Sequence, residues 1–165
     1  VQYLLGKDDT SPVKVEVDAP QQHHDAVGTW RSITYTYEDG CQIVLWGGDY
    51  AKPDTPYISG PNGNVYKNFV CDIPDWQKKL AGYPEPVEQH TDFLESIHTR
   101  EKFALNEING HRSCTIVNMG LVALQLNRTL EYDPVNELFV NDEQANRLID
   151  QPMRAPWSIS SQNSR

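Results

Sequence analysis

The sequence predicts an α+β domain with an open, mostly antiparallel sheet and helices packed on one face. Period-two alternation dominates before about residue 74, as in "VKVEVD", where Val13, Val15 and Val17 share a face. Helical spacing of apolar residues dominates after it. Both faces of the expected strands carry sizeable side chains, so we expect helices on one face and a second cover, such as another subunit, on the other.

Two hairpins account for the strand-rich half. Residues 28–48, "GTWRSITYTYEDGCQIVLWGG", predict two strands joined by a turn at Glu38-Asp39-Gly40. Residues 55–70 predict a second hairpin with its turn at Pro61-Asn62-Gly63. Trp30 lies on one face of the first strand, and Tyr35 and Tyr37 lie on the other. Whichever set points away from the helices would place aromatic side chains on the free face of the sheet. Such a face would favour a sheet-to-sheet homodimer.

Two helices are expected in the second half, near residues 88–98 and 110–126, both on one face of the sheet. Gly120, in the middle of the second helix, costs about 1 kcal/mol relative to Ala and indicates close packing against a neighbour. Two short strands follow in "RTLEYDP" and "ELFV". Asn141 is expected to cap the helix "DEQANRLI", with Gln144 completing a capping box.

Composition limits the kinds of partner. The 165 residues fit one domain, and 14 basic against 23 acidic side chains give a net charge of −9. This charge argues against nucleic acid and anionic membranes as partners. No apolar run is long enough to span a membrane. Three cysteines, Cys41, Cys71 and Cys114, lack metal-ligand spacing and are expected to be buried free thiols, which leaves a cytoplasmic or a periplasmic/secreted location open.

Two polar clusters have ordinary structural explanations. In "QQHHDA", neighbouring side chains on an extended segment point opposite ways, so His23, His24 and Asp25 are expected to form a solvated loop rather than a metal site. In "EQHTD", Glu88, His90 and Asp92 precede a helix, where acidic groups stabilise the helix dipole. Capping is therefore the expected role of the second cluster.

A third cluster, "INGHRS", places His111 and Arg112 at the expected start of the long helix. Cations oppose the dipole there, so these residues are candidates for contact with a carboxylate, a phosphate or a sugar. Pairing with Glu107 or another structural acid is the alternative, and the sequence leaves both open. No metal site, glycine-rich phosphate loop or Ser-His-Asp pattern is present, so neither a metal nor a nucleotide cofactor is expected in this chain.

The run from His90 to Trp157 resembles the C-terminal domain of Gfo/Idh/MocA-type oxidoreductases, most closely a bacterial branch of sugar dehydrogenases. The matching motifs, in family order, are residues 92–96 "DFLES", 110–113 "GHRS", 130–134 "LEYDP", 141–146 "NDEQAN" and 152–157 "PMRAPW". The resemblance implies a dihydrodipicolinate-reductase-like C-terminal fold that shapes a sugar pocket and forms a homo-oligomer through its free sheet face. The domain would span residues 1–157, followed by a tail at 158–165.

The opening "VQYLLG" looks like the end of the helix that carries the catalytic His and Asp in this family. The resemblance therefore implies that a Rossmann domain and those two residues lie upstream of Val1, outside this chain. NAD or NADP would be the cofactor of the parent enzyme, and the isolated chain is expected to be inactive. His111 and Arg112 would face the cleft where the Rossmann domain docks. Two alternatives stay open: a stand-alone binding or assembly module, and part of an NAD-dependent glycoside hydrolase.

Overall fold

The computed structural model describes residues 1–23, 28–52, 54–84, 91–104, 106–149 and 154. The chain forms two units. The first combines Val1–Gly47 with Glu107–Arg165, and the second is Gly48–Asn106. Each unit is described by itself below. The suggested tail at 158–165 lies outside the described residues, so the domain boundary stays a prediction.

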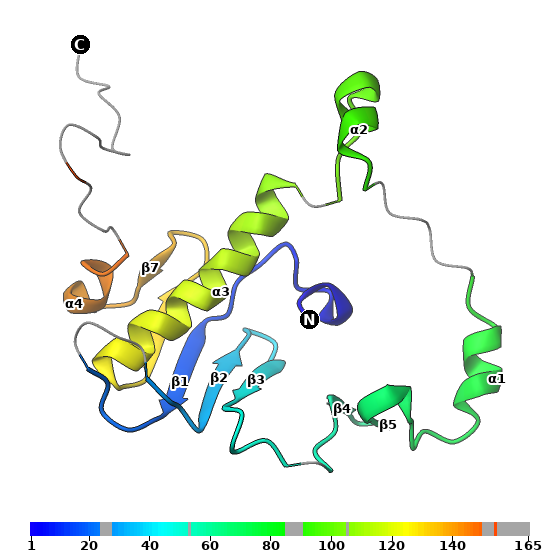
Figure 1. Ribbon diagram of the computed structural model, residues 1–165, viewed down its shortest axis with the longest axis horizontal. Helices are drawn as coiled ribbons and strands as arrows, with labels where there is room; N and C mark the ends of the chain where they lie inside the picture. Colours follow the sequence, from blue (N-terminus) through cyan, green and yellow to red (C-terminus); the bar gives the residue numbers. More distant parts are fainter. Residues whose placement is uncertain (24–27, 53, 85–90, 105, 150–153, 155–165) are drawn as a thin grey trace. The chain divides into compact units, whose positions relative to one another are not determined.

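A five-stranded antiparallel sheet organises the first unit (Figure 1). Its order is β3-β2-β1-β6-β7, and every neighbouring pair is antiparallel. The strands are β1 (Lys14–Asp18), β2 (Ser32–Thr36), β3 (Gln42–Trp46), β6 (Leu130–Asp133) and β7 (Leu138–Phe139). The turn between β2 and β3 contains Gly40 at φ 82°, a left-handed conformation that glycine adopts without strain. The predicted α+β class and first hairpin are confirmed.

The core lies between this sheet and α3 (Glu107–Leu126), which crosses one sheet face (Figure 1). Val15, Ile33 and Tyr35 contribute from the strands, while Met119 and Ala123 contribute from the helix. Helix and sheet approach closely at a glycine of α3, Gly120. A Cβ built there would lie 3.3 Å from Cζ of Tyr35 and closer still to its hydroxyl oxygen. The prediction that this glycine marks close packing is confirmed.

The opposite face of the sheet is mostly polar. Because Ile33 and Tyr35 point toward α3, their strand neighbours point the other way. The register aligns the outward-facing side chains across the three strands: Lys14, Glu16 and Asp18 of β1, Ser32, Thr34 and Thr36 of β2, and Gln42, Val44 and Trp46 of β3. Tyr35 and Tyr37 are buried, and Trp30 is half-buried against the core. The free face of the sheet therefore has no aromatic patch at these three positions. A sheet-to-sheet homodimer stays a prediction.

A short helix after β7, α4 (Glu143–Asn146), closes the far end of the sheet. Its cap is Asp142, whose side chain accepts a hydrogen bond from the Ala145 N–H at 3.0 Å. The predicted cap, Asn141, is wrong by one residue. Asn141 has a φ of 53°, outside the extended region that a residue capping through its side chain adopts.

The Asn146 side chain of α4 bonds to the backbone of β7. Its Oδ1 accepts from the Phe139 N–H at 2.7 Å, and its Nδ2 donates to the Phe139 carbonyl at 2.9 Å. A side-chain amide thus takes the place of a neighbouring strand at this edge. At the start of the chain, a 3₁₀ turn over Tyr3–Leu5 ends at Gly6, at φ 63°, as its sequence indicates.

The second unit consists of short elements: β4 (Ile58–Gly60), β5 (Gly63–Val65), a 3₁₀ turn (Lys67–Phe69), α1 (Trp76–Ala81) and α2 (Phe93–Thr99). The predicted hairpin is confirmed, with Gly60 paired to Gly63. No described residue between Gly48 and Asn106 is buried. Residues 88–90 of the expected helix lie outside the described residues, and packing of α2 on the sheet stays a prediction.

Candidate functional site

The two singled-out cations, His111 and Arg112, do not begin α3. The helix starts at Glu107, three residues before the expected start at Gly110. An acidic residue therefore occupies the first turn, which the helix dipole favours. The prediction that both cations oppose the dipole at the helix start is wrong, because they lie a full turn inside the helix.

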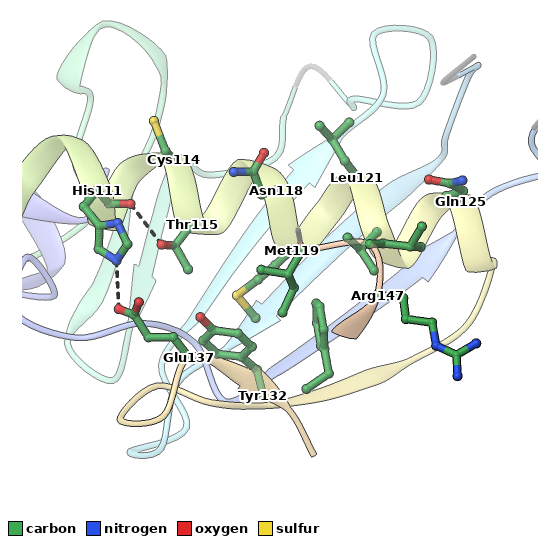
Figure 2. Close-up of a pocket in the computed structure, with 14 residues that line it drawn as sticks. His111, Cys114, Thr115, Asn118, Met119, Leu121, Gln125, Tyr132, Glu137 and Arg147 are labelled. Atoms are coloured by element: carbon green, nitrogen blue, oxygen red, sulfur yellow. Dashed lines mark hydrogen bonds and ion pairs between the residues drawn. The ribbon is translucent and has the colours of Figure 1, made fainter. Parts of the chain in front are cut away.

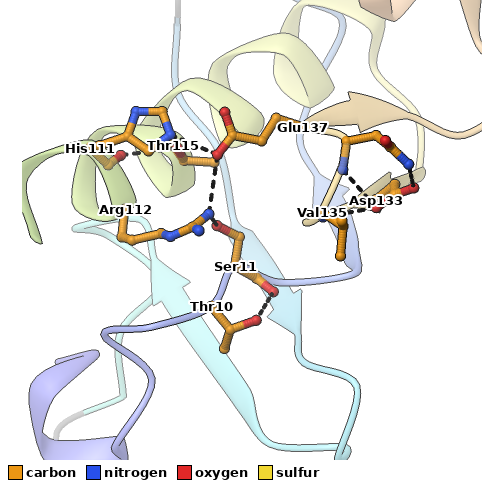
Figure 3. A network of polar contacts seen from close by, with 9 residues as sticks. Thr10, Ser11, His111, Arg112, Thr115, Asp133, Val135 and Glu137 are labelled. Carbon is orange, nitrogen blue, oxygen red and sulfur yellow. Dashed lines mark hydrogen bonds and ion pairs between the residues drawn. The ribbon is translucent and has the colours of Figure 1, made fainter. Parts of the chain in front are cut away.

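Both residues contact one carboxylate, that of Glu137, in the turn between β6 and β7 (Figure 3). The Nε2 of His111 lies 2.8 Å from Oε1 of Glu137. The Nη1 of Arg112 donates to the same oxygen at 3.2 Å and to the Ser11 hydroxyl at 3.3 Å. This cluster joins three segments that are distant in sequence. Of the two interpretations that the sequence allows, pairing with an acid is the arrangement observed, and the acid is Glu137 rather than Glu107.

Glu137 is held in place by a tight turn. Its φ is 57°, a left-handed conformation that costs a residue with a Cβ about 1–2 kcal/mol. The Asp133 carboxylate fixes the turn by accepting from the Val135 N–H at 2.8 Å and the Asn136 N–H at 3.1 Å. These bonds, and one from the Asn136 amide at 2.6 Å, hold the pKa of Asp133 below its ordinary value, with the Asn136 side chain as the largest cause.

The cluster is partly open to solvent. The side chains of His111, Glu137 and Arg112 are 53%, 40% and 21% exposed. A carboxylate only accepts hydrogen bonds, so His111 donates from Nε2, and the neutral ring then offers Nδ1 as an acceptor. The Nε of Arg112 is buried and has no hydrogen-bond partner among the described residues.

A groove of about 630 Å³ extends from this cluster along α3 (Figure 2). His111 and Glu137 stand at one end, and neutral hydrogen-bonding side chains of α3 continue along it: Thr115, Asn118 and Gln125. The aromatic rings of Tyr132 and Phe139 line it too, packed edge to face with centroids 5.4 Å apart. Burial, and then the nearby Glu137 charge, raise the pKa of Tyr132, so its hydroxyl stays protonated at neutral pH. The lining therefore combines polar and apolar groups, and it includes the Arg147 guanidinium.

The remaining candidates have structural roles or lie outside the description. Asp92 caps α2 by accepting from the Glu95 N–H at 3.0 Å, which confirms the capping interpretation for this residue. Glu88, His90, His24 and Asp25 fall outside the described residues. The three cysteines are free, but Cys41 and Cys71 are only half-buried and Cys114 is exposed, so the expectation that all are buried is wrong.

Within the described ranges, no three His, Cys, Asp or Glu side chains gather closely enough to hold a metal ion. In those same ranges, no helix has the length and apolarity needed to cross a membrane.

Sequence reasoning missed Glu137 and Ser11. Ser11 is 101 residues away from Arg112, and Glu137 is 25 away. The segment "YDPVNEL" carries a turn signal in Asp133-Pro134, but nothing in it indicates that the following acid turns back toward α3. The pairing of β6 with β1 brings both residues to the helix. Their contacts with Arg112 can be predicted only when that pairing is known.

An antiparallel sheet covered by a long helix, with a polar cluster beside it, defines an α+β domain. A family model described as "Oxidoreductase family, C-terminal alpha/beta domain" matches residues 1–159, so the chain belongs to the Gfo/Idh/MocA oxidoreductase family as its C-terminal domain. No curated protein and no solved structure is significantly similar to the chain.

Proposed function

We propose that this chain is the substrate-side domain of an NAD(P)-dependent oxidoreductase that acts on a sugar or polyol. The family match over residues 1–159 carries the proposal. It is supported by the cluster of His111, Arg112 and Glu137 at the end of the α3 groove.

The charge of the chain favours a neutral substrate. A net charge of −9 repels phosphorylated or carboxylated ligands as they diffuse toward the chain. The groove offers amide and hydroxyl groups from Thr115, Asn118 and Gln125, which can donate to and accept from hydroxyl groups. A sugar or polyol presents hydroxyl groups of this kind beside apolar C–H surfaces.

The residues of this chain would bind and orient the substrate. His111 can accept a hydrogen bond from a substrate hydroxyl at Nδ1 while Glu137 fixes its ring. Arg112 holds Glu137 in position from the other side. NAD or NADP, when bound by the complete protein, would take the hydride from the carbon bearing the substrate hydroxyl. No described strand-to-helix turn has the glycine-rich form that binds a dinucleotide, so we assign the cofactor to another part of the protein.

Calorimetric titration of this chain with NAD and with NADP tests whether the cofactor binds to another part of the protein. We expect no heat of binding from either nucleotide. The protein expressed from the complete gene should bind one of them and oxidise or reduce members of a panel of aldoses and polyols. Micromolar binding of a nucleotide to the isolated chain, or absence of redox activity in the complete protein with every sugar tried, would contradict the proposal.

Substitution in the complete protein tests the site. His111→Ala and Arg112→Ala should each lower kcat/KM by tenfold or more, about 1.4 kcal/mol in transition-state terms, while the melting temperature changes little. Lys78→Ala is a suitable control, because the Lys78 side chain is 86% exposed and does not line the groove. Normal activity of the folded variants, together with a collapse in stability, would make the two residues purely structural.

A further inference from the structure

The hydroxyl group of Tyr132 has no hydrogen-bond partner among the described residues, although the residue is only 7% exposed. A buried hydroxyl is normally paired, because leaving it without a partner costs free energy. The described side-chain polar atoms that are both fully enclosed and unpaired are Trp30 Nε1, Ser96 Oγ and Arg112 Nε. The Tyr132 hydroxyl is not one of them, so its oxygen still meets solvent.

The Tyr132 ring lies in the α3 groove, with its hydroxyl oxygen directed toward the end that holds Glu137 (Figure 2). The ring packs edge to face on Phe139, which holds it in place. Burial raises the pKa of the Tyr132 hydroxyl, and the nearby Glu137 charge raises it further. The O–H group is therefore intact at neutral pH and can donate a hydrogen bond into the groove.

The Glu137 carboxylate has one oxygen in use and one oxygen free. His111 and Arg112 both contact Oε1, at 2.8 and 3.2 Å, and no described residue donates to Oε2. The Glu137 side chain is 40% exposed, so Oε2 is open to a ligand. An ionised carboxylate only accepts hydrogen bonds. This end of the groove therefore presents an unused donor, on Tyr132, together with an unused acceptor, on Glu137.

A donor and an acceptor at one place select a chemical group that can both accept and donate. A hydroxyl does both through a single oxygen atom. A carbonyl or ether oxygen can only accept, so it would leave the carboxylate oxygen unpaired. A carboxylate or phosphate would be repelled by Glu137, and an ammonium group would gain little, because Arg112 already balances the Glu137 charge.

We propose that Tyr132 and the free oxygen of Glu137 bind one hydroxyl group of the ligand, and that Tyr132 thereby determines specificity. The ligand oxygen accepts from the Tyr132 O–H, and the ligand O–H donates to Oε2 of Glu137. A ligand without this hydroxyl leaves both protein groups unpaired, which is how a hydrogen-bonding site rejects a deoxy analogue. The inference rests on the proposed function for the class of ligand, a neutral sugar or polyol, and it adds the residue that recognises it.

Binding to the 165-residue chain, measured without any nucleotide, tests this inference separately from redox activity. The probes are a panel of aldoses, cyclitols and linear polyols, titrated while the backbone amide signals are followed by NMR. At least one neutral probe should shift the signals of residues that line the groove, such as Thr115 and Glu137. If no probe shifts them while the complete protein oxidises a sugar, this inference fails and the proposed function stands.

Tyr132→Phe removes only the hydroxyl and keeps the ring that packs on Phe139. It should weaken binding of the best probe about three- to tenfold, the loss of one neutral hydrogen bond. The melting temperature should not change, since the hydroxyl has no partner in the free chain. Tyr35→Phe is the matched control. It removes the same group from the same sheet, at a residue that does not line the groove, and should leave the affinity unchanged.

Monodeoxy analogues of the best probe identify the contact. The wild-type chain should bind one analogue with about tenfold lower affinity than the parent probe. Tyr132→Phe should narrow that difference, because the two changes remove the same hydrogen bond. Three results would overturn the proposal: a Tyr132→Phe effect that is equal for the parent and every analogue, an equal loss in Tyr35→Phe, or tighter binding of an amino analogue than of the parent. Unchanged affinity of Tyr132→Phe with a lowered melting temperature would make the hydroxyl structural.

Discussion

Tyr35 of β2 packs its phenol directly on Gly120 of α3, at the point where the helix presents no side chain to the sheet. The tyrosine is only 1% exposed, and its burial raises the pKa of its hydroxyl to about 12. The closest approach of helix and sheet therefore depends on the absence of a single Cβ.

Gly120→Ala should destabilise the chain by about 1–3 kcal/mol, because the added methyl group overpacks against the Tyr35 ring. Urea unfolding followed by circular dichroism measures this. Gly110→Ala is the control in the same helix. A Cβ there meets nothing within 4 Å, so the substitution should stabilise by up to about 1 kcal/mol through helix propensity alone. Equal effects at the two glycines would contradict the close contact.

Asp142→Asn should lower stability at neutral pH and have little effect near pH 2. The hydrogen bond from Arg128, and next the Ala145 N–H, lower the pKa of Asp142 to about 2 from an ordinary 3.8. A carboxyl with a lowered folded-state pKa stabilises above its unfolded pKa, and that contribution is lost as the pH falls from about 4 through 2. Asparagine can still accept from the Ala145 N–H, so the cap is retained while the charge is removed.

Urea midpoints for wild type and variant, measured at pH 7, 4 and 2, should therefore converge as the pH falls. Glu143→Gln, on the same helix but at a highly exposed site, controls for loss of a negative charge. A wild-type advantage that is constant down to pH 2 would rule out the proposed role of the carboxylate.

Glu137→Gly should be more stable than Glu137→Ala by about 1 kcal/mol. Both variants lose the contacts with His111 and Arg112, but only glycine relieves the left-handed backbone at φ 57°. The same pair of substitutions at Val135, whose φ is not positive, should give the reverse order, since glycine then costs more conformational entropy. The unfolding midpoints of the Gly and Ala variants at the two positions test this prediction. The same order at both positions would contradict it.

Asn146→Ala should cost about 1–3 kcal/mol, because it leaves the Phe139 N–H and C=O without their partners in a partly buried place. Thermal unfolding measures the loss. Glu143→Ala, in the same short helix, removes only an exposed ion pair and should change stability by less than about 0.5 kcal/mol. If both alanine variants behave alike, the amide does not stabilise the strand edge.

Local patterns in the sequence predicted much of the fold. Alternation in "SITYT" placed Ile33 and Tyr35 on one face, and the register confirms that these residues share the face toward α3. The turn at Gly40 and the close contact at Gly120 followed from the conformational freedom and small size of glycine. Each of these features depends on a few neighbouring residues, so a single sequence carries enough information.

The features that failed depend on residues that lie far apart or on backbone angles that composition does not set. Asn141 and Asp142 are equally good capping residues, and only the left-handed φ of Asn141 decides between them. The contacts of Arg112 with Ser11 and Glu137 can be predicted only when the pairing of β1 with β6 is known. His111 and Arg112 contact the same carboxylate, but the sequence did not indicate that this acid is Glu137.

No described residue of Gly48–Asn106 is buried, so this part of the chain should open more often than the five-stranded sheet. Where few apolar contacts hold a segment, its backbone hydrogen bonds break by local fluctuation, without global unfolding. Amide protons of β4, β5, α1 and α2 should thus exchange orders of magnitude faster than those of β1, β2 and α3. A protease should cut this segment first and leave the five-stranded sheet with its helix as the resistant product.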